Sequence, residues 1–341
     1  MISVAPAIGP TISGIILSLL DWRWMFWLVL PIGLGALALG RAKLVNVTEP
    51  KKTPLDLVSV PLSALGFGGL VYGLSAIGEG HGEGGAVPPW LPLVFGAMVV
   101  LWFGARQLRL GPQGRALLDL RTFRVQVFTV SVVMMALCMM ALFGMIILLP
   151  IYMQAVLGMT PLQAGLLLLP GGLLMGLMAP FVGRMFDKVG ARKLVIPGSV
   201  AVSGGLWAMA ALGTESGMAA VLGAHVLLSI GLALLFTPLF TSSLGSLPKE
   251  LYPYGSAVIG TVQQVAGAAG IALFVSVMSL RIGAETAAGA DMVDATAAGV
   301  RVGFATGAAI AMLMIVASFF VRRPPDMVKD PRRSTTRNSV R

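Results

Sequence analysis

Charged residues are scarce in this sequence. They make up 11% of its 341 residues, whereas an ordinary soluble domain carries about 25%. Hydrophobic residues account for 57% of the chain. This balance excludes an ordinary soluble domain and predicts that lipid surrounds most of the polypeptide.

Cysteine and histidine are nearly absent as well. The chain has one cysteine, Cys138, and two histidines, His81 and His225, so we expect no disulfide framework and no thiolate or His-rich metal site. The middle of every predicted span lacks Asp and Glu, which leaves no carboxylate pair for acid–base chemistry there. A membrane enzyme therefore finds no support, and we expect no metal ion and no cofactor.

Ten charge-poor stretches have about the length that a helix needs to cross a bilayer, which is about 20 residues. They predict an all-α, polytopic membrane protein. The first stretch is interpreted as a span and not as a signal peptide, because no basic region precedes it. The predicted spans are residues 2–20, 24–40, 57–77, 90–105, 125–148, 162–182, 194–213, 218–240, 257–280 and 302–321.

The basic residues test these spans independently, because Lys and Arg collect in short cytoplasmic loops. Of the 24 basic residues, 21 fall in one alternate set of connections and in the C-terminal tail, and the other set carries only Arg23, Arg281 and Arg301. We therefore expect a multi-pass protein of the cell membrane with both termini in the cytoplasm. The basic residues form no single face with interleaved aromatics, so nucleic acid is not an expected partner.

The first predicted span begins with the unusual segment APAIGPTISG, residues 5–14. On a helix, Gly9 lies on a stripe of small residues, and Pro10 and Gly14 lie on the adjacent stripe, where helix backbones can approach closely. Pro10 also removes one backbone donor and bends or loosens a helix. Two interpretations are open: an ordinary packing seam with a kink, or a mobile helix that forms part of a gate.

Four segments resemble the fourteen-span drug:proton antiporters of the major facilitator superfamily. APAIGPTISG, followed by DWRWMFWLVLPIG, resembles the antiporter motif of the fifth span and the loop after it, although the family usually has Gly-Gly where Ser13 and Gly14 stand. Residues 148–172 resemble the junction of the ninth and tenth spans. Residues 255–273 resemble the thirteenth span, although the family often has Arg in place of Gln263. GRMFDKVGARK, residues 183–193, resembles the cytoplasmic loop of the superfamily.

The resemblance implies that the chain runs from the fifth span of the family to beyond its fourteenth, and lacks the first four. Residues 1–45 would be the last two spans of the N-terminal bundle, 46–121 two linking spans with cytoplasmic loops, 122–322 a six-span C-terminal bundle and 323–341 a cytoplasmic tail. The implied function is secondary active transport, namely proton-coupled efflux of small organic or drug-like compounds. The alternative is a truncated fragment that does not transport.

The segment 183–193 is predicted to be a loop with a gating role. The superfamily loop that it resembles holds the cytoplasmic side closed through charge contacts. The alternative interpretation is an ordinary basic cytoplasmic loop with one carboxylate. We expect two glycines to allow a tight turn there. The candidate gating residues are Gly183, Arg184, Asp187, Gly190, Arg192 and Lys193.

The expected partners are the lipid bilayer, a small organic substrate and protons. A proton antiporter needs a titratable group within the membrane, and His225 is the one titratable side chain well inside a predicted span. It is either a proton relay or a neutral, hydrogen-bonded packing residue. The possible polar groups of a central cavity are Gln154, Gln263, Gln264 and His225, because an amide in hydrocarbon needs a partner.

Overall fold

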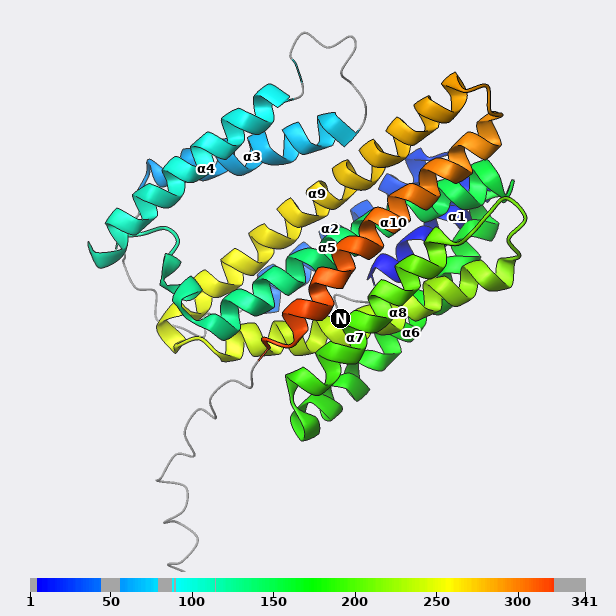
Figure 1. Ribbon diagram of the computed structural model, residues 1–341. Helices are drawn as coiled ribbons and strands as arrows, with labels where there is room; N and C mark the ends of the chain where they lie inside the picture. Colours follow the sequence, from blue (N-terminus) through cyan, green and yellow to red (C-terminus); the bar gives the residue numbers. More distant parts are fainter. Residues whose placement is uncertain (1–4, 44–55, 79–87, 89, 114, 322–341) are drawn as a thin grey trace, which may run out of the picture.

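The computed structural model describes residues 5–43, 56–78, 88, 90–113 and 115–321, and every regular element in this part of the chain is helical (Figure 1). Ten α-helices are present, as predicted. They are α1 (Ala5–Leu19), α2 (Arg23–Lys43), α3 (Ser59–Gly78), α4 (Trp90–Leu110), α5 (Gln126–Ile151), α6 (Pro161–Val189), α7 (Ala191–Ala210), α8 (Met218–Gly245), α9 (Tyr252–Ala287) and α10 (Met292–Ser318). Short helical turns lie between them: η1 (Gly111–Gln113), η2 (Leu120–Arg124), η3 (Tyr152–Val156) and η4 (Lys249–Leu251).

Nine of these helices, α2 to α10, are long and apolar enough to cross a membrane. The remaining helix, α1, has 15 described residues. The fourth span is longer than predicted, because α4 continues to Leu110. Pro92 lies in its first turn, where a missing backbone N–H leaves no helical hydrogen bond unmade.

The largest departure from prediction is at the α9–α10 connection. We expected Arg281 and Arg301 to lie in a loop, but Arg281 lies within α9 and Arg301 within α10. The apolar runs of α9 and α10 end at the expected boundary of the membrane. The helices continue beyond it, because their backbone hydrogen bonds do not depend on lipid. Asp291 then starts α10 by accepting a hydrogen bond from the Val293 N–H at 3.2 Å, a standard N-cap.

Helices α5 to α10 form one bundle, in which α5 contacts α8, α9 and α10 (Figure 1). Glycines let these helices approach closely. In lipid the hydrophobic effect does not drive helices together, so their association relies on close van der Waals packing at small residues. A Cβ atom at Gly270 of α9 would lie 2.6 Å from the Met140 backbone of α5, and one at Gly144 of α5 would lie 2.5 Å from the Phe274 ring of α9. The Phe274 side chain is buried in this contact.

The helices α3 and α4 form a hairpin, and α3 packs along α9 (Figure 1). Their contact is close, because a Cβ atom at Gly73 of α3 would lie 2.5 Å from the Leu93 nitrogen of α4. The Ser276 hydroxyl of α9 donates a hydrogen bond of 3.4 Å to the Ile77 carbonyl of α3. The hairpin is therefore fixed against the side of the six-helix bundle.

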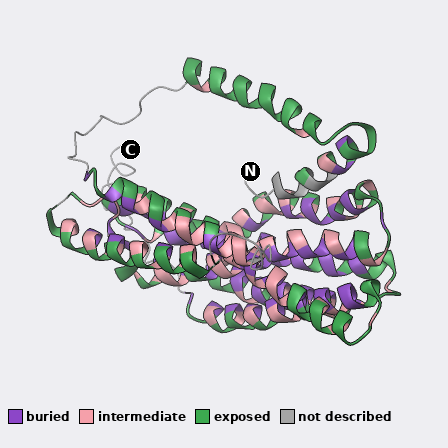
Figure 2. Cartoon of the chain, turned by 90° about the horizontal axis from the view of Figure 1, so that it is seen from above, coloured by how far each residue is buried: buried purple, intermediate pink, exposed green. Residues whose placement is uncertain are grey.

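The N-terminal helices are attached differently. Helix α1 packs against α6, but no residue of α2 is buried, and Figure 2 shows α2 coloured almost wholly as exposed. The aromatic side chains of α2 are exposed: the exposed fraction is 67% for Phe26 and 63% for Trp27. Such an apolar surface belongs in lipid or against another helix and not in water.

Candidate functional site

The contact between α1 and α6 involves Gly14. This residue is buried, and a Cβ atom on it would lie 2.9 Å from the Pro161 carbonyl oxygen and 3.2 Å from the Leu162 Cα. Gly9 is exposed, with no atom within 4 Å of the corresponding position. Pro10 lies within the same helix, but its side-chain surroundings are outside the described structure. The close approach at Gly14 therefore joins the helix of the APAIGPTISG motif to the first residues of α6.

The start of α6 is fixed by local chemistry. Thr160 and Gln163 form a capping box, in which the Gln163 N–H donates to the Thr160 hydroxyl and the Thr160 N–H donates to the Gln163 side chain. Pro161 at the first helical position has a backbone already suited to a helix. The preceding turn uses Gly158 at a φ of 65°, which favours glycine. The segment GMTPLQAG thus positions Pro161 opposite Gly14.

The segment 183–193 is not the loop that we predicted. Helix α6 continues through Gly183, Arg184 and Asp187 to Val189, and α7 begins at Ala191. Residues 183–189 contain no proline, and α6 continues through Gly183 to the turn at Gly190, which has a φ of 81° and donates its N–H to the Phe186 carbonyl at 2.8 Å. The two helices therefore meet at a single glycine, which is the usual way to end a helix abruptly.

The charged candidates at this junction are all exposed: Arg184, Asp187, Arg192 and Lys193. Asp187 forms no ion pair with another described residue. A gating role for this segment stays a prediction, and the described arrangement leaves the Asp187 carboxylate available for a partner that approaches the end of α6.

His225 of α8 is buried against α6, with 5% of its surface exposed. Its Nε2 lies 3.1 Å from the Leu168 carbonyl oxygen, so Nε2 carries the proton and donates in the neutral ring. Nδ1 is buried and has no hydrogen-bond partner among the described residues. Gly171 makes room for the ring, because a Cβ atom there would lie 2.5 Å from Nε2. The result is an unused acceptor between two helices.

The three glutamines do not join His225 in one polar cluster. Gln154 is exposed in η3, Gln264 is exposed on α9 and Gln263 is half-buried beside it. No hydrogen bond between described residues connects any of them to another of the four cavity candidates. Their assignment to a substrate cavity stays a prediction.

Sequence reasoning missed a polar network at one end of the α3–α4 hairpin. Arg106 of α4 binds the buried Asp56 with two hydrogen bonds, and the Ser59 hydroxyl donates to the same carboxylate at 2.6 Å. Gln107 donates to Ser59 at 2.7 Å and accepts from the Leu118 N–H at 3.1 Å. The sequence did contain a signal for this contact. Asp56 precedes the third predicted span and Arg106 follows the fourth, so the two opposite charges lie at the same end of two consecutive spans.

The Arg106 guanidinium and then the Ser59 hydroxyl hold the pKa of the Asp56 carboxyl well below its usual range. Asp119 forms a second, local pair with Arg121, whose guanidinium lowers the pKa of that carboxyl. Both carboxylates are therefore structural anions: Asp56 holds the α3–α4 hairpin, and Asp119 holds the segment before α5.

The fold and these contacts define a class of protein: a multi-pass helical membrane protein whose helices pack through small residues, with buried polar groups at helix contacts. Comparison with known proteins narrows the class. The sequence profile of the Major Facilitator Superfamily matches residues 1–271. The lincomycin resistance protein LmrB of Bacillus subtilis (strain 168) is 39% identical over 329 residues, which cover 95% of this chain and 68% of that protein. The protein of the same name from Listeria monocytogenes is 38% identical, with 95% and 69% covered.

A solved structure shares the fold. It is the inward-facing, unoccupied form of a bacterial homologue of the human lysosomal transporter Spinster, with a TM-score of 0.51 and 17% identity over 77% of this chain and 68% of that one. The chain belongs to the Major Facilitator Superfamily. It is a membrane transporter by family, and its relatives are transporters and not enzymes.

Proposed function

We propose that this protein exports small, drug-like organic compounds across the cell membrane in exchange for protons, as a member of the fourteen-span antiporters. Two of its relatives are named lincomycin resistance proteins, which supports lincomycin as the first substrate to test. The basic residues support an orientation with both termini in the cytoplasm.

The close approach of Gly14 to Pro161 is the observation that carries this proposal. It brings together the two segments with the most specific resemblance to the drug:proton antiporters, one on α1 and one at the start of α6. The contact lies at the end of α6 that the charge distribution assigns to the outside. Transporters alternate access by moving one bundle against the other, and a contact of backbone on backbone at this end closes one side of the path.

A proton-coupled transporter needs a titratable group within the membrane. Such groups are rare there because burying them in lipid is costly, so those that are present usually have a function. Among the described residues, His225 is the one Asp, Glu or His side chain buried inside a membrane-spanning helix. Its free Nδ1 supplies a site for one proton. Ionisable groups at membrane depth usually mark ion pathways, so His225 is the candidate proton site on this part of the chain.

The alternative function is a fragment that inserts without transporting. The observation that favours it is α2, which has no buried residue. One experiment separates the two: the chain is expressed in cells without their own lincomycin exporters, and lincomycin accumulation and growth inhibition are measured. Lower accumulation supports transport, and normal accumulation with full membrane insertion supports the fragment.

The matched variants are Gly14→Leu and Gly35→Leu. Leucine at position 14 would collide with the Pro161 backbone, whereas Gly35 of α2 has no atom within 4 Å of its Cβ position. Export should be lost in the first variant and kept in the second. Equal export by both variants would remove the closing role of the α1–α6 contact.

A further inference from the structure

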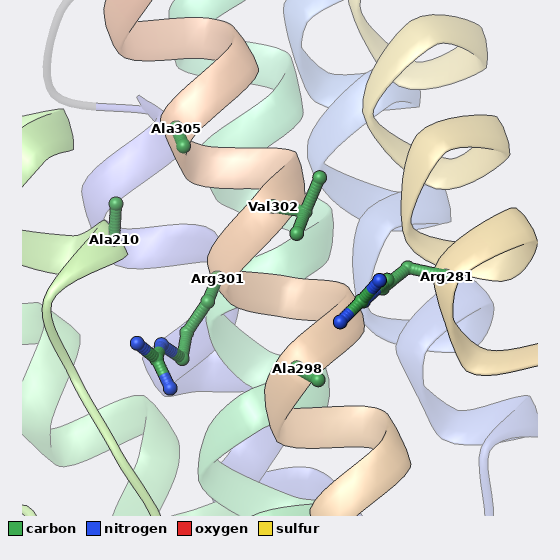
Figure 3. Close-up of a pocket in the computed structure, with 6 residues that line it drawn as sticks. All are labelled: Ala210, Arg281, Ala298, Arg301, Val302 and Ala305. Carbon is green, nitrogen blue, oxygen red and sulfur yellow. The ribbon is translucent and has the colours of Figure 1, made fainter. Parts of the chain in front are cut away.

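Two of the three basic residues on the expected outer side line the same hollow. Arg281 reaches it from α9 and Arg301 from α10, and the hollow has a volume of about 280 Å³ (Figure 3). The rest of its lining is small and apolar, and consists of Ala210, Ala298, Val302 and Ala305. In Figure 3, Arg281 extends from α9 toward α10, and Arg301 extends from α10 toward Ala210 at the end of α7.

The hollow lies at the level where lipid headgroups begin. The run 302–321 directly after Arg301 contains no charged residue and has the length of a helix that crosses a hydrocarbon core of about 30 Å. On α9 the run 252–280 is also free of charge, and Arg281 is the first charged residue beyond it. Both arginines therefore stand at the same boundary of the apolar region.

The two arginines are not fully neutralised by the protein. Arg281 forms an ion pair with Glu285, one turn further along α9. Arg301 forms no ion pair with another described residue. The hollow is therefore lined by one guanidinium without a counter-charge among the described residues and by a second one whose side chain remains half exposed.

The geometry points to a binding site for the phosphodiester group of an anionic phospholipid. Guanidinium groups present planar forks of N–H donors that match phosphate oxygens. The apolar floor of Ala298 and Val302 suits the part of a lipid where the headgroup joins the acyl chains. Sites for drug-sized ligands occupy about 300–1,000 Å³, and this hollow, at about 280 Å³, is smaller and suits a compact group such as a phosphodiester.

The test measures phosphatidylglycerol bound to the purified full chain in detergent, by native mass spectrometry over a lipid titration. Wild-type protein should bind one phosphatidylglycerol about tenfold more tightly than the Arg281→Gln/Arg301→Gln variant, since both charge-assisted contacts are lost. Arg23→Gln is the matched control, because Arg23 is a basic residue on the same expected side that lines a different hollow, with Asp21. It should bind lipid as wild type does.

Three results would overturn the site. Equal lipid binding by the double variant would show that the arginines do not hold the headgroup, and an equal loss in the Arg23→Gln control would show general attraction only. Displacement of the lipid by millimolar inorganic phosphate, with phosphate itself bound at one equivalent, would assign the hollow to the free anion. If the double variant fails to fold, Arg301→Gln and Arg301→Lys replace it: Gln should lose the lipid, and Lys should retain part of the binding because it keeps the charge.

Discussion

Arg106 binds both carboxylate oxygens of Asp56, with Nε 2.7 Å from Oδ2 and a terminal nitrogen 2.9 Å from Oδ1. This fork-to-fork pair joins the segment before α3 to the end of α4. Two parallel hydrogen bonds fix an orientation as well as a distance. The α3–α4 hairpin is therefore closed at this end by directional contacts, namely this ion pair and the Gln107–Ser59 hydrogen bond, whereas the contact at Gly73 is close packing against α4.

Replacement of the carboxylate should loosen the hairpin. Asp56→Asn leaves the Arg106 guanidinium without a counter-charge and weakens the Ser59 hydrogen bond, so the melting temperature of the purified protein should fall. Arg109→Gln is the control, because Arg109 is exposed one turn along and forms no ion pair with a described residue. An Asp56→Asn protein as stable as Arg109→Gln would mean that the pair adds nothing to stability.

The same pair predicts a pH dependence with a definite sign. Because the folded pKa of Asp56 is depressed, its stabilising contribution is fully present above the unfolded pKa of about 3.9 and is lost as the pH falls from there toward the folded pKa. The difference in melting temperature between wild type and Asp56→Asn should be constant from pH 7 to pH 5 and should shrink below about pH 4. A difference that shrinks near neutral pH would point to another group.

Gly171 makes a second, independent prediction about packing. The His225 ring occupies the space where a side chain at position 171 would lie. Gly171→Ala therefore forces α6 and α8 apart and should cost about 1–3 kcal/mol of stability. Gly223→Ala is the control on α8, because no atom lies within 4 Å of its Cβ position and alanine is the better helix former. Thermal unfolding in detergent would measure both, and equal melting temperatures would contradict the close contact.

The sequence predicted what depends on local composition and missed what depends on register between helices. The ten helices follow from charge-free runs, and the small residues around Gly14 indicated a close contact. The partner at Pro161 could not be named, because it lies on a helix far along the chain. The Asp56–Arg106 pair was missed for the same reason. The helical course of residues 183–189 was missed because Gly183 and Gly190 were both taken as turn residues. Of these two glycines, Gly190 has a positive φ and Gly183 continues the helix.

The α6–α7 junction provides a test of gating. Asp187 is exposed and unpaired with described residues, so Asp187→Asn should leave insertion and stability unchanged. We expect it to lower export severalfold if the carboxylate forms its contact in another state of the transport cycle. Glu250→Gln is the control, because Glu250 is another exposed carboxylate on the expected cytoplasmic side. Equal flux per inserted molecule in the two variants would remove the gating role.

His225 decides whether the described part of the chain couples export to protons. Glutamine at this position can still donate an N–H to the Leu168 carbonyl, but it cannot bind a proton between pH 5 and pH 8. His225→Gln should therefore keep the fold while vesicle uptake of the substrate loses its response to an imposed pH gradient. Ser229→Ala, one turn along α8 and also next to Gly171, is the matched control and should keep that response. Uptake by His225→Gln that still follows the gradient would make His225 a packing residue and would move the coupling group to another part of the protein.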